Sequence, residues 1–321
     1  MKHVRHVVAA ALALAPMACA MAEAQYPGKP IRFLVGVVPG GAADFLARIV
    51  GQRLGERLGT QVIVDNRPGA NQTIAAQLTA QATPDGHTIL IVPSAHAISP
   101  SIYKLKYDPV NDFSTIGLLA IVPNVLVVHP AIPANTVQEF VAYARKRPQE
   151  LNMGSSGTGS PSHLAGELFQ MMTQMRLTHV PFKGQGAAMV ELVAGRLQTG
   201  FPSVPASLPH VKAGRMRALG VTPRQRSSAM PDVPTLAEAG VNGYEVAGWY
   251  GVLGPARIPK KIVARLNEEI VTLLRDPAMH EHLTRTGADP LPSSPEEFRK
   301  VLVDDIGKWA KVVRAVGVKV Q

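Results

Sequence analysis

Apolar runs that end in glycine or proline alternate with segments of helical periodicity along most of the chain. Residues 31–38 form a near-continuous apolar run, typical of a strand buried on both faces, and a Pro-Gly-Gly sequence follows it. From residue 45 to residue 58, apolar side chains recur at spacings of three and four, which predicts a helix that Gly59 terminates. Strands that alternate with helices in this way predict parallel sheets covered by helices.

The same alternation continues along the chain and predicts an α/β fold. Further strands are predicted at residues 62–64, 88–92, 116–119, 125–128, 151–155, 180–182, 197–201 and 216–221. Further helices are predicted at residues 74–82, 136–146, 161–175, 187–194, 262–274 and 298–313. The last helix follows Ser294-Pro295-Glu296-Glu297, which has the residues of a capping box.

The length of the chain favours two lobes over one. It has 321 residues, 46% of them apolar, so it can bury a large core. Single cores usually stop growing at roughly 250 to 300 residues. Two lobes with a cleft between them are therefore expected.

The first two dozen residues read as a secretory signal peptide. Basic residues 2–6 precede an apolar stretch, residues 7–18, which is too short to cross a hydrocarbon core that needs about 20 residues. Small residues then favour cleavage after Ala24 and export to the periplasm. A membrane anchor or a lipoprotein acylated at Cys19 is the alternative, disfavoured because Pro16 stands where a lipobox places leucine.

Composition excludes several kinds of protein chemistry. Cys19 is the only cysteine and lies in the predicted leader, so disulfides, thiol nucleophiles and thiolate metal ligands are not expected. His280 and His282 diverge on a helix and read as surface residues, and no cofactor is expected. The net charge is +10, but the basic residues are scattered and aromatics make up only 5%, which disfavours nucleic acid as a partner.

Glycine-rich loops recur where predicted strands lead into helices. They occupy residues 38–44, 66–71, 154–160 and 183–186. Helix N-termini carry unpaired N–H groups and about half a positive charge, and glycine lets a ligand approach the backbone closely. In open α/β sheets such loops gather at the carboxyl ends of the strands, so a carboxylate or phosphate site is predicted there. None of the loops has a complete nucleotide-binding motif.

Individual side chains in these loops have alternative roles. The hydroxyls of residues 155–160 suit a carboxylate, although Ser160 followed by Pro161 is also a helix cap. His96 and His163 are as readily structural as ligand-binding. Asp44 stands in a first helical turn, where its negative charge interacts favourably with the helix dipole. Its carboxylate either receives a ligand amine or orients the loop.

Two other functions are considered. A secreted serine hydrolase would use Ser156 with His163, but the G-x-S-x-G nucleophile elbow is absent. A regulatory effector-binding domain would need a DNA-binding helix pair at the N-terminus, where this chain has its leader.

Six short motifs together resemble a known family. They are residues 39–44 (PGGAAD), 65–70 (DNRPGA), 84–86 (PDG), 154–163 (GSSGTGSPSH), 180–184 (VPFKG) and 231–240 (PDVPTLAEAG). In this order they resemble the Bug-type substrate-binding receptors of tripartite tricarboxylate transporters. The resemblance implies a non-enzymatic, monomeric periplasmic receptor of the two-crossover binding-protein fold, each lobe a mainly parallel sheet flanked by helices. It would close by a hinge on a small organic carboxylate and deliver it to membrane permease subunits.

The resemblance also implies domain limits and ligand-binding positions. Domain one would be residues 25–124 with 248–321, and domain two residues 125–247. The implied ligand-binding residues are Val38, Gly40, Gly41, Asp44, Ser94 and His96 of the first lobe and Ser156, Thr158, Ser160, His163, Lys183 and Ser203 of the second. The chain departs from the family pattern at Asn71-Gln72, where a glycine pair is usual, before Pro39, where an aromatic is commoner, and at Ser203, where many relatives have an acid.

Overall fold

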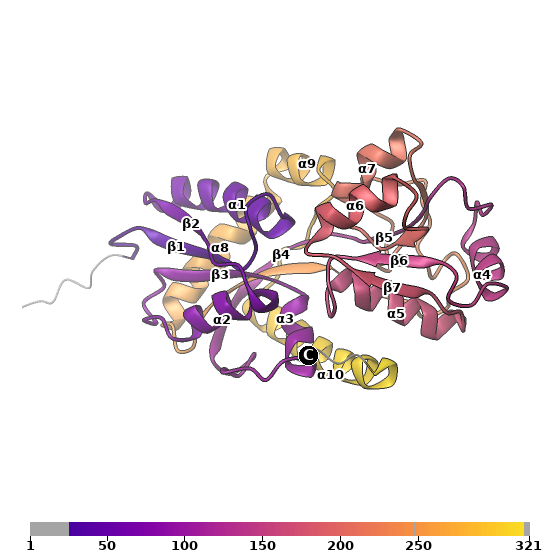
Figure 1. The fold of residues 1–321 in the computed structure, drawn as a ribbon. Coiled ribbons are helices and arrows are strands. Elements are labelled where there is room, and N and C mark those ends of the chain that lie inside the picture. Colours follow the sequence, from indigo (N-terminus) through magenta and orange to yellow (C-terminus); the bar gives the residue numbers. More distant parts are fainter. Residues whose placement is uncertain (1–25, 247, 318–321) are drawn as a thin grey trace, which may run out of the picture.

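Two lobes, each built on its own sheet, make up the protein, as the computed structural model in Figure 1 shows. The structure describes residues 26–246 and 248–317, so the predicted leader, with Cys19 and the cleavage site at Ala24, lies outside the described residues. No helix in the described ranges is long and apolar enough to span a membrane.

The first lobe has a six-stranded sheet in the order β11-β4-β10-β3-β1-β2. Its strands are β1 (Ile31–Val35), β2 (Val62–Asn66), β3 (Thr88–Pro93), β4 (Phe113–Ile121), β10 (Trp249–Pro255) and β11 (Asp289–Pro290). β1 is parallel to β2 and β3, and β10 is antiparallel to both β3 and β4. β1 to β4 therefore run in one direction, and only β10 and β11 oppose them.

The second lobe has a five-stranded sheet in the order β7-β6-β8-β5-β9. Its strands are β5 (Val125–Val128), β6 (Asn152–Ser155), β7 (Thr178–Pro181), β8 (Thr199–Gly200) and β9 (Arg217–Val221). β6 is parallel to β7 and β8, whereas β5 is antiparallel to β8 and β9. All strands but β5 share one direction, so the two-lobed, mainly parallel α/β fold is confirmed.

Helices flank both sheets. Those of the first lobe are α1 (Ala42–Leu58), α2 (Thr73–Ala80), α3 (Ala95–Ile98), α8 (Lys260–Arg275) and α9 (Pro277–Arg285). Those of the second are α4 (Val137–Arg145), α5 (Pro161–Thr173), α6 (Gln185–Val193) and α7 (Val204–Lys212). Gly59 ends α1 in the left-handed conformation, as predicted.

Three expectations need correction. The first strand ends at Val35, not at residue 38, because residues 36–38 leave the sheet to form the loop before α1. β10 was not predicted as a strand, although it lies at the centre of the first sheet. α7 was also missed, because proline at two of its positions obscures the helical pattern.

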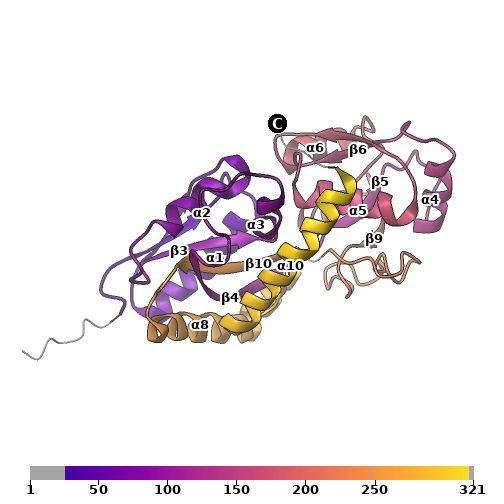
Figure 2. The same cartoon turned by 90° about the horizontal axis from the view of Figure 1, so that it is seen from below.

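A long helix, α10 (Pro295–Val316), joins the two lobes. Its predicted capping box at Ser294 is present. Figure 2 shows α10 crossing from the first lobe to the second, and it packs against β4 and α3 on one side and α5 on the other. The ring of its buried Phe298 lies 5.5 Å from that of Trp249, whose Nε1 donates to Asp305 at 2.6 Å. Burial raises the pKa of the Asp305 carboxyl.

The chain passes between the sheets twice. The first crossover, residues 122–124, connects β4 to β5, and the second connects Val246 to β10. The N–H of Val122 donates to the carbonyl of Gly248 at 2.8 Å, so the two crossovers lie side by side. The domain limits predicted at these crossovers stay a prediction.

Candidate functional site

The carboxyl ends of the parallel strands in both sheets lie next to the crossovers. In the first lobe, the N–H of Ser94 directly after β3 donates to the carbonyl of Trp249 at 2.9 Å. In the second lobe, Ser203 after β8 forms a β-bridge with Asn124 of the first crossover. In the first sheet β1 is parallel to β3, and in the second β6 is parallel to β7 and β8. In each sheet, the loops that follow these strands therefore emerge at one edge. The glycine-rich loops of the two lobes therefore face each other (Figure 1).

One contact of the Gly/Ser loop, residues 154–160, crosses from lobe to lobe. Gly159 of the second lobe lies against Ile102 of the first, and a Cβ placed at Gly159 would be 2.7 Å from the Ile102 Cδ1. The second lobe's Gly/Ser loop therefore contacts the first lobe at Ile102. The open cleft expected between the lobes stays a prediction.

Asp44 holds the first glycine loop in place. Its Oδ2 accepts from the Gly40 N–H at 2.9 Å, and its Oδ1 accepts from the Asn66 amide at 2.9 Å. Arg48 donates to both oxygens, at 3.0 and 2.9 Å. Burial opposes ionisation of Asp44, but the hydrogen bonds from Arg48, Gly40 and Asn66 outweigh it and lower its pKa.

Of the two roles considered for Asp44, the structure therefore supports orientation of the loop. The side chain is 3% exposed and both its oxygens are engaged, which leaves no place for a ligand amine. The same Asn66 amide also donates to the Val37 carbonyl at 3.0 Å, so β2 helps to fix the loop. Val38 projects at its tip and is 62% exposed.

Helix N-termini at these loops lack side-chain caps. No side-chain hydrogen bond caps α1 at Gly41, α6 at Gly184 or α7 at Ser203. In α1 and α6, backbone N–H groups of the first turn are thus left for another acceptor, whereas in α7 the Val204 N–H already donates to the Pro123 carbonyl at 2.8 Å. Together with the partial positive charge of each helix end, they favour an anion.

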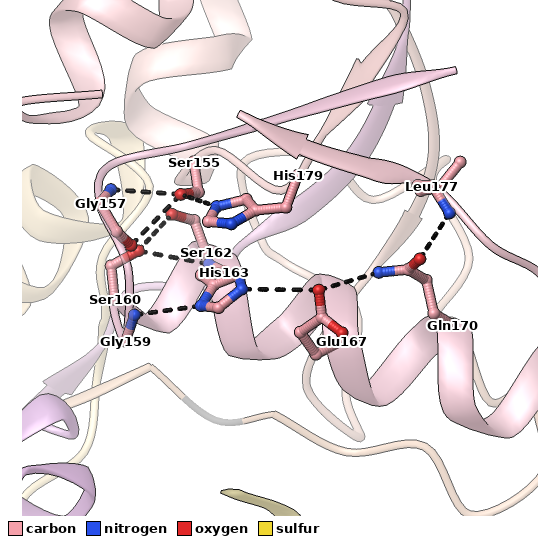
Figure 3. Close-up of polar contacts among 10 residues, drawn as sticks. All are labelled: Ser155, Gly157, Gly159, Ser160, Ser162, His163, Glu167, Gln170, Leu177 and His179. Carbon is pink, nitrogen blue, oxygen red and sulfur yellow. Dashed lines mark hydrogen bonds and ion pairs between the residues drawn. The ribbon is translucent and has the colours of Figure 1, made fainter. Parts of the chain in front are cut away.

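The Gly/Ser loop after β6 is braced from within (Figure 3). The Ser162 hydroxyl accepts from the Ser156 N–H at 3.0 Å and contacts the hydroxyls of Ser156 and Ser160, each at 3.0 Å. Ser160 Oγ accepts from the N–H of His163 and so caps α5. Ser160 is thus a buried capping residue, whereas Thr158 is exposed.

Both ring nitrogens of His163 contact groups of its own loop and helix. Its Nδ1 accepts from the Gly159 N–H at 3.0 Å, and its Nε2 faces Glu167 Oε1 at 3.5 Å (Figure 3). The ring is 4% exposed and stacks on His179 with centroids 3.8 Å apart. Both ring nitrogens of His163 thus face its own loop and helix, and neither contacts the Ser156 hydroxyl; the expected role of His163 in ligand binding stays a prediction.

His96 is structural as well. Its Nε2 donates to the Pro109 carbonyl at 2.9 Å, and its ring packs between Tyr107 and Phe113. Burial lowers its pKa to about 4, so the ring is neutral at pH 7. These contacts do not support the expectation that His96 faces the ligand, and neighbouring Ser94 is buried as well.

The loop that contains Lys183 is fixed to its neighbours by hydrogen bonds. The Gly184 N–H donates to the Ser156 carbonyl at 3.2 Å, and Gln185 Nε2 donates to Ser203 Oγ at 2.8 Å. Lys183 itself is exposed and makes no ion pair with another described residue. Lys183 therefore places a positively charged ammonium group within the loop that follows β7.

Several functional residues escaped the sequence-based selection. Asn66 and Gln185 lie inside quoted motifs, but only the structure shows that they connect separate loops. His179 precedes a predicted strand, and nothing in the sequence indicates its stacking on His163. Among the residues described, no cluster of three or more His, Cys, Asp or Glu could hold a metal.

Two histidines, buried His96 and half-buried His179, predict a loss of stability in mild acid. Burial, with a smaller effect of the neighbouring His163, lowers the pKa of His179 to about 4, and that of His96 is similar. The unfolded chain takes up these protons near pH 6.5, while the folded protein does not. Stability is therefore full above pH 6.5 and falls as the pH drops towards 4.

Urea unfolding between pH 7.5 and 4.5 measures this effect. His179→Gln is expected to reduce the slope of stability against pH, whereas His280→Gln, at an exposed position, leaves it unchanged. An unchanged slope in His179→Gln would contradict the assignment of His179 as a half-buried neutral histidine.

Comparison with known proteins identifies the family. The family model described as "Tripartite tricarboxylate transporter family receptor" matches residues 46–318. The chain belongs to this receptor family. The receptor is 32% identical over 318 residues to the protein BugT of Bordetella pertussis, with 98% of each chain covered.

Solved structures of similar proteins have the same fold. The Rhodopseudomonas palustris protein Rpa4515, determined with adipate, is 36% identical with a TM-score of 0.85, and the match covers 92% of the receptor and all of that chain. MatC of the same organism, determined with malate, is 30% identical with a TM-score of 0.80, and the match covers 90% of the receptor and all of that chain.

Proposed function

We propose that this receptor captures a small organic carboxylate between its lobes and releases it unchanged. The observation that carries the proposal is that one helix of each lobe, α1 and α6, begins at a glycine-rich loop without a side-chain cap. N–H groups and helix dipoles favour a carboxylate without any arginine fork. The relatives determined with adipate and malate support a carboxylate ligand.

The proposed binding surface combines backbone groups with exposed side chains. In the first lobe it comprises Val38 and Gly41, and in the second Ser156, Thr158, Lys183 and Ser203. Asp44, Ser160 and His163 position these loops rather than contact the ligand. Closure by a hinge at the two crossovers would bury the carboxylate between the loops.

The receptor is proposed to bind rather than catalyse. Ser156 lacks the histidine base that a hydrolase needs. Ser155 Oγ does lie 2.6 Å from His179 Nε2, but Ser155 is 1% exposed, so a substrate cannot reach its hydroxyl. The proposal extends to export into the periplasm, a monomeric state, and delivery of the ligand to the permease subunits of a tripartite tricarboxylate-type transporter.

Isothermal titration calorimetry and thermal shift with a panel of mono-, di- and tricarboxylates test the proposal. Saturable binding of at least one carboxylate with a rise in Tm is expected, because a ligand that binds only the folded state stabilises it. Neutral amides of the same carbon skeletons serve as controls and should not bind. Absence of heat and of thermal shift across the panel would refute the proposed function.

A further inference from the structure

The loop between β2 and α2 holds a strained backbone. Ala70, Asn71 and Gln72 have φ values of 43°, 49° and 73°, so three consecutive residues other than glycine lie in the left-handed region. Such conformations cost free energy and are retained where the surrounding structure, often a binding site, imposes them. The loop follows directly from Gly69, whose φ of 133° is accessible only to glycine.

Two polar atoms of this loop are buried without a partner. The amide nitrogen of Asn71, Nδ2, and the amide oxygen of Gln72, Oε1, make no hydrogen bond with any residue that the structure describes. Buried polar atoms in folded proteins are nearly always hydrogen-bonded. An unpaired donor on Asn71 and an unpaired acceptor on the next residue, Gln72, thus remain.

Both side chains line a small cavity in the first lobe. Its volume is about 10 Å³, room for one water-sized group, and it is bounded by Asn71, Gln72, Leu90, Ile91, Val92, Pro93, His96, Ser99 and Tyr107. Gln72 packs against Gly36, where the first glycine loop begins, and a Cβ at Gly36 would lie 2.5 Å from that of Gln72. The cavity therefore adjoins the first glycine loop of the proposed binding surface.

We propose that Asn71 and Gln72 form a subsite that recognises a hydroxyl group on the carboxylate ligand. A hydroxyl is both donor and acceptor, so a single oxygen can accept from Asn71 Nδ2 and donate to Gln72 Oε1. A methylene group would leave both amides unpaired, and a second carboxylate has no hydrogen to give to Gln72. The ligand class is accordingly a hydroxycarboxylate, an inference that rests on the proposed function.

Calorimetry with carboxylates that differ by one hydroxyl tests the subsite on the purified protein. Suitable pairs are succinate with malate, glutarate with 2-hydroxyglutarate, and butyrate with 3-hydroxybutyrate. In at least one pair, the hydroxylated member is expected to bind at least tenfold more tightly, because the other leaves buried polar atoms unpaired. Equal affinities, or tighter binding of the unhydroxylated members, would refute the subsite but not the proposed function. No binding by any carboxylate would refute both.

The double variant Asn71→Gly/Gln72→Gly separates recognition from a structural role. Glycine adopts positive φ freely, so the variant is expected to keep or raise Tm while the affinity ratio falls to about one. Gln149→Gly is the matched control, because exposed Gln149 has a φ of 64° in the second lobe. Gln149→Gly should relieve backbone strain at residue 149 without changing the ratio of affinities for hydroxylated and unhydroxylated carboxylates. A double variant that retains the wild-type ratio would overturn the proposal.

Discussion

Replacing Gly248 with alanine is expected to lower the free energy of unfolding by about 3 kcal/mol or more. Gly248 is buried in the second crossover, and a Cβ there would overlap the carbonyl oxygen of Val122 in the first. That oxygen belongs to the backbone and cannot rotate away as a flexible side chain would. The overlap would push the two crossovers apart at the point where the Val122 N–H donates to the Gly248 carbonyl.

Urea or thermal unfolding of Gly248→Ala measures the loss. Gly307→Ala is the matched control, because Gly307 is an exposed position of α10 with nothing within 4 Å of a Cβ. It is expected to be neutral or stabilising by up to about 1 kcal/mol, since alanine favours the helix over glycine. A Gly248→Ala protein as stable as wild type would show that the crossovers are not tightly paired in solution. If Gly248→Ala folds, weaker ligand binding is also expected, because the lobes would no longer close in register.

Asp44→Ala is expected to weaken carboxylate binding by roughly 10- to 100-fold and to lower stability by about 2 kcal/mol. The substitution removes the acceptor that holds the Gly40 N–H and the Asn66 amide together. The first glycine loop would then sample many conformations in the free protein and would have to be ordered by the ligand. Because Asp44 has no free oxygen for the ligand, the loss would come through positioning.

Calorimetry with the best ligand of the panel measures this effect. Glu238→Ala is the matched control, because Glu238 also accepts from a backbone N–H, that of Thr235, and from an arginine, Arg226. It lies after β9, in a segment that contributes no residue to the proposed binding surface, and its replacement should leave affinity unchanged. Asp44→Asn, which keeps one oxygen acceptor, should fall between Asp44→Ala and wild type. Wild-type affinity in Asp44→Ala would remove Asp44 from the site altogether.

Local patterns predicted most of the elements correctly. Apolar runs located β3, β5 and β9, and the periodicity of residues 45–58 located α1, because a strand or helix with one buried environment repeats that pattern in its own sequence. The capping box at Ser294 was also correct, since a cap depends only on neighbouring residues. β10 escaped because its centre-sheet position depends on β3 and β4, which come more than a hundred residues earlier.

The candidate site was predicted less completely than the fold. Sequence motifs correctly placed the glycine loops at strand ends, but they gave no indication of which side chains face outward. His163 and His96 have the chemistry of ligand-binding residues. However, the ring nitrogens of His163 contact Gly159 and Glu167, and Nε2 of His96 donates to the Pro109 carbonyl. Asn71 and Gln72 stood out only as a departure from a glycine pair.

The sequence by itself determined the α/β class, the loops that carry backbone donors and the family to which the chain is similar. These features depend on residues that are close together in the chain, where hydrophobic period, glycine and proline act directly. Only the tertiary structure decided that Asp44 is saturated, that two histidines stack, and that an unpaired donor and acceptor share one cavity. The physical reason is that hydrogen-bond partners and burial are set by elements distant in sequence, and those pairings have no local signature.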